Sequence, residues 1–231
     1  MKFENTQVFN FQGAFRGMRN PLESWARSDS DFSDPGNPII GENDLTLAKA
    51  LIKGGSEHRK FLRQICVSVD ITAPLYWFKE FDTYRVGVTP NSTSTMHCLS
   101  KRPITIDCFE IDDYSQLICD ETEPEPYLNV TNVFEKIENS LIPFLENLRL
   151  KYIKTKNKRY WKELIRWLPE SWLQTRTITM NYENIANMVH QRENHKLNEW
   201  SGKDDPELNN FISWARTLPY AKELIFNEEE E

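Results

Sequence analysis

The fold is decided by residues 58–97, whose sequence is HRKFLRQICVSVDITAPLYWFKEFDTYRVGVTPNSTSTMH. Between residues 64 and 73, apolar side chains alternate with mildly polar ones, which is the pattern of a β-strand that buries one face. Such a strand belongs to a largely antiparallel sheet or lines a cavity. Pro74 ends the strand and suits the first turn of a short, aromatic-rich helix over residues 75–81.

A polar segment follows at residues 81–97, where small hydroxyl and amide side chains replace the apolar ones. Arg85 lies near its beginning and His97 at its end. A segment that leaves the core and at once presents such groups suits a bound anion or a polar ring. The same residue types are typical of surface loops. Taken alone, the segment therefore leaves both interpretations open.

Most of the other expected elements are helices. Residues 44–53 predict a helix with an apolar stripe, capped by Asn43 or Asp44 and ended by two glycines at 54 and 55. Alternation over about 102–119 predicts a second strand pair. The remaining helices are expected over about 128–153, 181–197 and 205–217.

Composition limits the classes of function. The chain has 231 residues, of which 39% are hydrophobic, and its seven Trp and thirteen Phe residues are enough to build a real core. Its net charge of −7 argues against a broad, sequence-independent grip on DNA and favours small ligands. The eight Lys and Arg residues between 149 and 166 are interpreted as a solvated face, and nucleic-acid binding is the weaker alternative.

The chain is expected to form one domain over residues 1–231. It would comprise an N-terminal segment at 1–40, an acidic, proline-punctuated linker at 120–126 and a disordered acidic tail at 227–231. The N-terminus lacks the basic and apolar run of a signal peptide, and no apolar stretch approaches the roughly 20 residues that span a bilayer. The four cysteines form no CxxC pair. These features predict a cytoplasmic protein with reduced thiols and no membrane partner.

Familiar catalytic patterns are missing from the sequence. It contains no informative Ser-His-Asp or Cys-His set, no GxGxxG or GxxxxGK and no HxxxH, so no metal site is predicted. Arg192 is the most informative single residue, because its helical spacing from Ile185 and Met188 directs it along the apolar face. A buried arginine needs an anion. The partner is either an internal carboxylate, such as Glu199 or Asp70, or a ligand phosphate held bidentately.

Residues 58–97 resemble the signature region of the flavin-dependent thymidylate synthases, the ThyX family. The family pattern is approximately H-x-x-P-F-E-H, an alternating strand, A-P with an aromatic helix, and then R-H-R-x-x-S-x-N-E-x-S-x-R-Y. Here His58 takes the place of the first histidine and Ala73-Pro74 that of A-P, with no gap as far as Arg85. A second, weaker match in the C-terminal half consists of Leu168-Pro169, Asn181, Asn187 and Arg192.

The resemblance implies an α+β, ThyX-like fold, with a largely antiparallel sheet flanked by helices and a helical C-terminal half. It further implies a homotetramer that binds flavin adenine dinucleotide (FAD) and dUMP at sites shared between subunits. A carbon would come from methylenetetrahydrofolate and a hydride from NADPH through the flavin. The implied cofactor-binding positions are His58, Tyr84, Arg85, Asn91, Asn187 and Arg192. The implied substrate-binding positions are Ser92, Ser94 and His97, and Arg192 is also the implied catalytic residue.

The sequence departs from the family pattern at several places. Thr83-Tyr84-Arg85 replaces R-H-R, Ser92 replaces the glutamate, and Met96-His97 replaces R-Y. Glu183 stands where an N-x-R arginine is expected. Further departures are Gln64 for the second histidine, Val88 for the first serine and an inserted Pro90. Two or three cations that would face ligand phosphates are therefore lost, and each charge-assisted hydrogen bond is worth about 1.5–3 kcal/mol of binding free energy. This loss of affinity leaves two hypotheses open. The chain is a divergent enzyme that alkylates C5 of a pyrimidine deoxynucleotide, or a non-catalytic homologue with a binding, regulatory or structural role.

Overall fold

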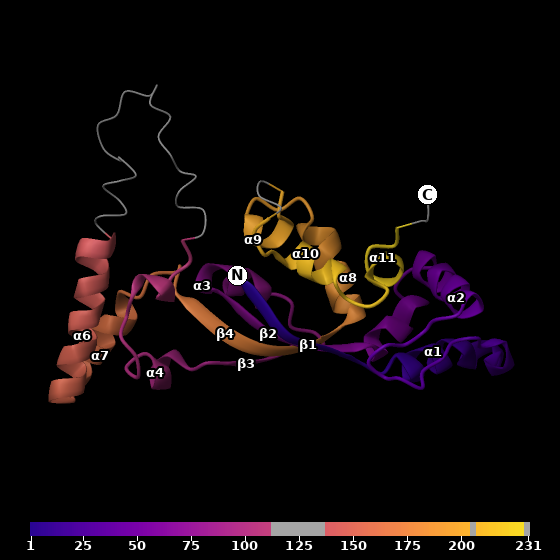
Figure 1. Ribbon diagram of the computed structural model, residues 1–231, viewed down its shortest axis with the longest axis horizontal. Coiled ribbons are helices and arrows are strands. Elements are labelled where there is room, and N and C mark those ends of the chain that lie inside the picture. Colours follow the sequence, from indigo (N-terminus) through magenta and orange to yellow (C-terminus); the bar gives the residue numbers. More distant parts are fainter. Residues whose placement is uncertain (112–136, 204–206, 229–231) are drawn as a thin grey trace, which may run out of the picture. The chain divides into compact units, whose positions relative to one another are not determined.

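The computed structural model describes residues 1–111, 137–203 and 207–228 (Figure 1). It combines helices with a four-stranded sheet in the order β1-β2-β4-β3. The strands are β1 (Lys2–Phe9), β2 (Cys66–Pro74), β3 (Thr89–Ser92) and β4 (Leu173–Asn181). β1 pairs with β2 in antiparallel register, with Lys2 opposite Thr72 and Phe9 opposite Cys66. The predicted α+β class, with helices beside an antiparallel sheet, is confirmed.

The described residues form two compact units. Unit 1 comprises Met1–Thr72, Glu80–Asn91 and Arg176–Glu231, and unit 2 comprises Ala73–Lys79 and Ser92–Thr175. The main helices of unit 1 are α1 (Phe11–Arg19), α2 (Glu42–Lys53), α8 (Tyr182–Arg192), α9 (Asn198–Ser201), α10 (Phe211–Arg216) and α11 (Ala221–Leu224). Its 3-10 turns are η1 (Asn20–Leu22), η2 (Trp25–Arg27) and η3 (Arg59–Gln64). The expectation of a single domain stays a prediction.

Strand β2 and the helix after it form where the sequence places them. The inward side chains are fully or almost fully buried along β2, whereas the alternate ones are half-buried, as the two-residue period requires. The buried set is Val67, Val69, Ile71 and Ala73. Helix α3 (Leu75–Phe81) follows at once and buries Trp77, Phe78 and Phe81. The aromatic run after Pro74 therefore anchors the start of the polar segment 81–97.

Helix α2 confirms the expected helix near 44–53, but its cap differs. The helix begins at Glu42, and the carboxylate of Asp29 accepts hydrogen bonds from the backbone N–H groups of Asn43 and Asp44 at 2.9 and 3.1 Å. The Asp44 side chain is instead fully buried and contacts Arg19 of α1, with 2.5 Å between Oδ1 and Nε. The cap therefore comes from a loop distant in sequence, while the predicted capping residue joins two helices.

Unit 2 is built around α6 (Ile142–Thr155) and α7 (Lys158–Arg166), which pack side by side (Figure 1). A five-residue π-turn, η5 (Ile137–Leu141), precedes α6, so Pro143 falls in the first helical turn, where its missing N–H is harmless. The core of the unit consists of Leu99, Ile104, Cys108, Phe109, Leu145, Leu164 and Trp172. Arg149, expected on a solvated face, is buried and donates to Glu146 and to the carbonyl of Ser100.

Several element predictions are wrong. Over 102–111 the expected strand is replaced by a 3-10 turn, η4 (Ile106–Cys108), and a single bridge from Phe109 to Trp172. The helix expected from 181 to 197 ends at Arg192, and the one expected from 205 begins at Phe211, where Asn210 provides a capping box. The linker at 120–126, the parts of expected elements within 112–136, and tail residues 229–231 lie outside the described residues.

Candidate functional site

Helix α8, in unit 1, carries two of the predicted site residues, Asn187 and Arg192. Its first residue follows a capping box, in which the Asn181 side chain accepts from the Asn184 N–H at 3.0 Å and the Asn184 side chain accepts from the Asn181 N–H at 3.2 Å. One face of the helix is buried through Tyr182, Ile185, Ala186, Met188 and Val189. The packed face fixes the helix, so the polar residues between these positions are presented at defined places.

The polar segment is attached to the N-terminal end of α8. The Asn184 side chain donates to the carbonyl of Val86 at 2.8 Å, and the next residue, Gly87, has a φ of +74°. A Cβ at Gly87 would lie 3.0 Å from the amide nitrogen of Asn181, so both the backbone angle and the space require glycine. The predicted loop is therefore a positioned element whose path is set by α8.

Arg192 lies at the other end of α8 and is surrounded by partners. Its Nε donates to the hydroxyl of Tyr84 at 2.9 Å, and that hydroxyl donates to Oε1 of Gln191 at 3.0 Å. Its Nη1 lies 3.0 Å from Oε2 of Glu80, and its guanidinium lies 5.0 Å from the ring centre of Trp200. The expectation of an anionic partner is met within the protein. The two carboxylates considered from the sequence, Glu199 and Asp70, are replaced by Glu80.

A second ion-pair cluster joins α8 to η3. The buried carboxylate of Glu183 pairs with Arg63, whose Nη2 lies 3.3 Å from Oε1, and with Arg59, whose Nε lies 3.4 Å from the same oxygen. Arg59 also donates from Nη2 to Oδ1 of Asn187 at 2.9 Å. Hydrogen bonding and charge from Glu183 raise the pKa of Arg63. Asn187 is therefore engaged by a side chain that sequence reasoning did not consider.

Other predicted cofactor positions in unit 1 are more open. Arg85 is exposed and donates from Nε to the carbonyl of Asp82 at 3.0 Å, its one hydrogen bond to another described residue. Asn91 is exposed on β3. Asp82 is itself fixed by an ion pair of 2.6 Å with Arg176 of β4. The terminal nitrogens of Arg85 are thus presented from an anchored turn.

His58 lies at a cavity of about 800 Å³ formed by α1, η1, α2 and η3. Its imidazole packs against Gly54, where a Cβ would lie 3.1 Å from the ring. The cavity has an apolar part, which includes Met18, Leu47, Leu51 and Phe61, and a polar part formed by Glu57, His58, Lys60 and Arg63. His58 and Arg63 share this cavity, so it meets the Glu183 cluster through Arg63.

The three predicted substrate-binding residues belong to unit 2. Ser92 ends β3 and is exposed, and His97 is exposed on the short helix α4 (Thr95–Cys98). Ser94 precedes α4, and its carbonyl accepts the N–H groups of His97 and Cys98 at 3.1 and 2.8 Å. None of the three side chains makes a hydrogen bond within the part of the chain that the structure describes.

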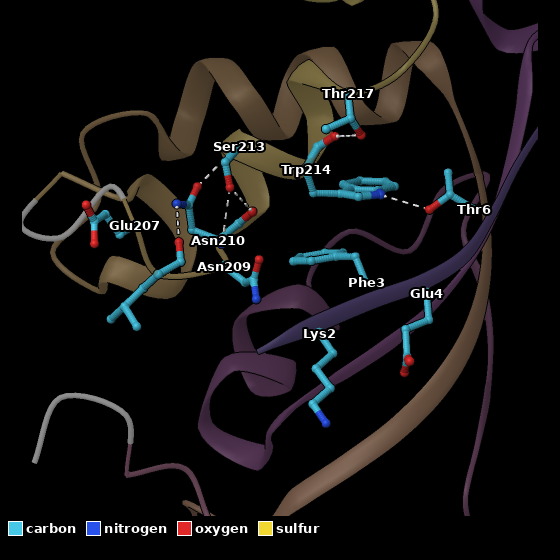
Figure 2. Close-up of a pocket in the computed structure, with 11 residues that line it drawn as sticks. Lys2, Phe3, Glu4, Thr6, Glu207, Asn209, Asn210, Ser213, Trp214 and Thr217 are labelled. Atoms are coloured by element: carbon cyan, nitrogen blue, oxygen red, sulfur yellow. Dashed lines mark hydrogen bonds between the residues drawn. The ribbon is translucent and has the colours of Figure 1, made fainter.

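A further cavity, of about 760 Å³, lies in unit 1 between β1 and α10 and contains no predicted site residue (Figure 2). Phe3 stacks on Trp214, with 5.1 Å between ring centres and 10° between planes. The indole N–H of Trp214 donates to Oγ1 of Thr6 at 3.1 Å. Figure 2 shows both contacts on one side of the strand. They attach the N-terminal strand to α10.

Two kinds of feature are absent from the described residues. No group of three or more His, Cys, Asp or Glu residues could hold a metal ion within residues 1–111, 137–203 and 207–228. Over the same ranges, no helix has both the length and the hydropathy needed to cross a membrane.

Sequence reasoning missed Arg59, Arg63, Glu80 and Trp200 as neighbours of the site. Glu80 directly precedes the polar segment, and Arg59 directly follows His58. Their position next to predicted residues was the one feature of the sequence that could have identified them. Their partners on α8 lie 112 residues further along the chain for Glu80 (192 − 80) and 128 for Arg59. No spacing rule links residues that far apart.

Comparison with known proteins gives matches among solved structures. Thymidylate synthase X (ThyX) from Helicobacter pylori, crystallised with FAD and dUMP, matches with a TM-score of 0.62 and 16% identity over 98% of each chain. A second structure of flavin-dependent ThyX from the same organism, also complexed with FAD and dUMP, matches with a TM-score of 0.57 and 18% identity, over 97% of this chain and all of the other. Neither a protein-family model nor a curated protein matches. The chain therefore has a ThyX-like fold.

Proposed function

We propose that this chain is a divergent enzyme of the flavin-dependent thymidylate synthase type. It binds FAD and alkylates C5 of a pyrimidine deoxynucleotide, dUMP or a related one, with methylenetetrahydrofolate as carbon donor and NADPH as reductant. The observation that carries the proposal is the fold, which matches two ThyX structures holding FAD and dUMP over nearly the whole of both chains. Conservation of fold alone does not specify chemistry, so the side chains must supply the rest.

The donor set suits a flavin nucleotide. A dinucleotide needs cations for its phosphates and planar or amide groups for its rings. Arg85 offers two terminal nitrogens from an anchored turn, and Arg63 is half exposed at the cavity that also holds His58. Tyr84 supplies an aromatic ring, and Asn91 supplies an exposed amide. These residues would hold the cofactor.

The protein side of the proposed reaction consists of binding and orientation. Flavin, when bound, supplies the redox chemistry. Arg192 is held at Nε by Tyr84 and at Nη1 by Glu80, so its remaining nitrogen, Nη2, has a fixed direction. Its side chain is only 18% exposed, which strengthens any hydrogen bond it donates, because little water competes. Ser92, Ser94 and His97 would contact the nucleotide through side chains that make no hydrogen bond within the described residues.

The alternative is a non-catalytic ThyX-like homologue that binds a nucleotide or acts as a regulatory or structural protein. Two observations favour it. Glu183 stands at an expected arginine position and occupies both Arg59 and Arg63, and Glu80 occupies Arg192. A homotetramer with sites shared between subunits is part of both versions of the proposal.

A visible spectrum of the purified protein, with and without added FAD, is the first test. The enzyme hypothesis expects the absorbance of bound flavin after reconstitution and gel filtration. A colourless protein that takes up no flavin contradicts it. Thermal unfolding should also shift upward with FAD, because a ligand that binds only the folded state stabilises it.

Tritium release from 5-³H-dUMP with FAD, folate and NADPH separates the two versions. The enzyme hypothesis expects release that is lost in Arg192→Ala. Arg216→Ala is the matched control, since Arg216 also pairs with a glutamate, Glu228, at 3.0 Å and lies over an aromatic ring, that of Phe226, at 4.0 Å. Flavin binding without release from any pyrimidine nucleotide favours the non-catalytic homologue.

A further inference from the structure

Unit 2 carries a concentrated positive charge that the proposed function does not use. Seven Lys and Arg residues and a single Glu residue lie between residues 151 and 166, although the chain as a whole has a net charge of −7. All seven cationic side chains are exposed: Lys151, Lys154, Lys156, Lys158, Arg159, Lys162 and Arg166. The net charge of the whole chain therefore does not describe this short stretch of α6 and α7.

Helix α7 (Lys158–Arg166) collects four of these cations on one side. Lys158, Lys162 and Arg166 follow one another at intervals of four residues, and Arg159 comes three residues before Lys162, so all four share a face of the helix. From first to last they cover about 12 Å of the helix axis. Arg166 is paired with Glu163, with 2.5 Å between Nη1 and Oε1. No carboxylate of a described residue pairs with Lys158, Arg159 or Lys162, so their charges are available to a ligand.

The turn between α6 and α7 holds this face in a fixed place. Lys156 closes α6 in the left-handed region at φ +55°, and its N–H donates to the carbonyl of Tyr152 at 2.8 Å. The side chain of Asn157 then caps α7 by accepting from the N–H of Arg159 at 3.0 Å. Across the two helices, the ring centres of Tyr152 and Trp161 lie 4.8 Å apart. A ligand that binds α7 therefore requires little reorganisation of the chain.

The apolar side of α7 is already used in the core of unit 2. Leu164 is fully buried, and Trp161 and Ile165 pack against the same core cluster. A helix that binds a membrane surface inserts its apolar face into the lipid and keeps its cations at the headgroups. Because the apolar face of α7 is not free to insert, the helix attracts a polyanion through its charged side alone. That restriction favours a nucleic acid, with its regularly spaced phosphates, over a lipid surface.

We propose that the cationic face of α7 binds the phosphate backbone of a nucleic acid without reading its sequence, the alternative that the sequence alone favoured less. The inference goes beyond the proposed function and applies to either version of it. Lys and Arg side chains bind phosphate oxygens through charge-assisted hydrogen bonds, and such contacts carry no sequence information. The contact is confined to one helix of nine residues, so a chain with a negative net charge can make it. The affinity is that of non-specific, salt-dependent binding.

The test follows the fluorescence anisotropy of a fluorescein-labelled DNA duplex of mixed sequence as the full-length protein is added at several KCl concentrations. Each neutralised phosphate releases counterions, so the logarithm of the association constant falls by about 0.9 per contact for each tenfold rise in salt. With Lys158, Arg159 and Lys162 each contacting a phosphate, a fourfold rise in salt should weaken wild-type binding by about 40-fold.

The double variant Lys158→Gln/Lys162→Gln removes two of these three charges and keeps the helix propensity, since Gln and Lys are similar helix formers. Its affinity should fall, and the same rise in salt should weaken the remaining binding by only about 3.5-fold. The matched control is Lys49→Gln/Lys53→Gln, which removes two charges at the same four-residue spacing from α2 of unit 1 and should leave the salt dependence unchanged. Lys158→Arg/Lys162→Arg keeps the charges and should bind as wild type does.

Vesicles of phosphatidylcholine and phosphatidylserine form a second arm, because Leu150, Ile153 and Trp167 are exposed apolar side chains of the same unit. Tighter binding to the vesicles than to the duplex, at equal phosphate concentration, assigns the face to a membrane and overturns the proposal. Wild type that does not bind the duplex at low salt also overturns it, as does a salt dependence that Lys158→Gln/Lys162→Gln leaves unchanged. A circular dichroism spectrum establishes that each variant is folded.

Discussion

Asp44→Asn should be among the most destabilising single substitutions in unit 1. Asp44 is fully buried, Arg19 is 4% exposed, and 2.5 Å separates Oδ1 from Nε. Oδ2 of Asp44 accepts from the hydroxyls of Ser28 and Ser30 at 2.6 Å each. Removing the carboxylate charge leaves a buried guanidinium uncompensated, and Nη2 of Arg19 already has no hydrogen bond to another described residue. Breaking a buried pair from one side costs about 3–5 kcal/mol.

Thermal unfolding followed by circular dichroism measures the effect. For a chain of this length one kcal/mol corresponds to about 2–4 °C, so the midpoint should fall by roughly 6–20 °C. Glu228→Gln disrupts an exposed ion pair and should cost less than about 1 kcal/mol. Adding Arg19→Met to Asp44→Asn should recover part of the loss, because the unpaired charge is then removed. Equal costs for Asp44→Asn and Glu228→Gln would refute the reasoning.

The same carboxylate gives stability a defined pH dependence. Burial acts to raise the pKa of Asp44, but hydrogen bonds from Ser28, Ser30 and Arg19 outweigh burial, so the pKa lies below its ordinary value of 3.8. A carboxyl whose folded pKa is depressed contributes stability that is fully present above the unfolded pKa and is lost as pH falls through the folded one. Wild type should therefore lose stability relative to Asp44→Asn as pH falls below 3.8.

Two further predictions concern a glycine of unit 1 and an ion pair of unit 2. Gly87→Ala should lower the free energy of unfolding by about 1–2 kcal/mol because of the left-handed backbone at φ +74°, and by a further amount because the new Cβ would press against the α8 cap. Gly55→Ala, at φ +92° with open space around it, should show the cost of the backbone strain alone. Equal costs for the two substitutions in urea unfolding would contradict the role of the α8 cap. In unit 2, Glu146→Gln should cost about 3–5 kcal/mol because it leaves Arg149, which is buried, without its carboxylate. The pKa of Glu146 is lowered mainly by its hydrogen bond to Arg149, so the wild-type advantage should disappear in acid.

The parts of the fold that the sequence predicts are those with a complete local signal. Strand β2 alternates without interruption, and α3 follows a proline directly, so both were found. Strand β4 was missed because its buried positions include Gln174, a polar residue that breaks the apolar alternation. Strand β1 was missed because it lies at the edge of the sheet and most of its side chains are exposed. Both strands form through pairing with distant parts of the chain, which the local sequence pattern does not reveal.

The site shows the same division between local and distant information. Helical spacing was enough to infer that Arg192 lies towards the apolar side and needs an anion, and the structure supplies that anion. The identity of the anion depends on which side chain the fold brings beside Arg192 within unit 1, and Glu80 and Arg192 are separated by 112 positions (192 − 80). Residue types predict what a side chain requires, whereas only the assembled fold identifies the partner that meets the requirement.

Two glutamates, Glu183 and Glu80, alter the charge of the predicted site more than the number of lost cations suggests. Glu183 does not merely remove one expected arginine, because its carboxylate also engages Arg59 and Arg63. The carboxylate of Glu80 likewise pairs with Arg192. Among the described residues around α8, Arg85 is left as the predicted cation without a carboxylate partner. A ligand phosphate at Arg192 would therefore have to compete with the carboxylate of Glu80, whereas no carboxylate of a described residue pairs with Arg85.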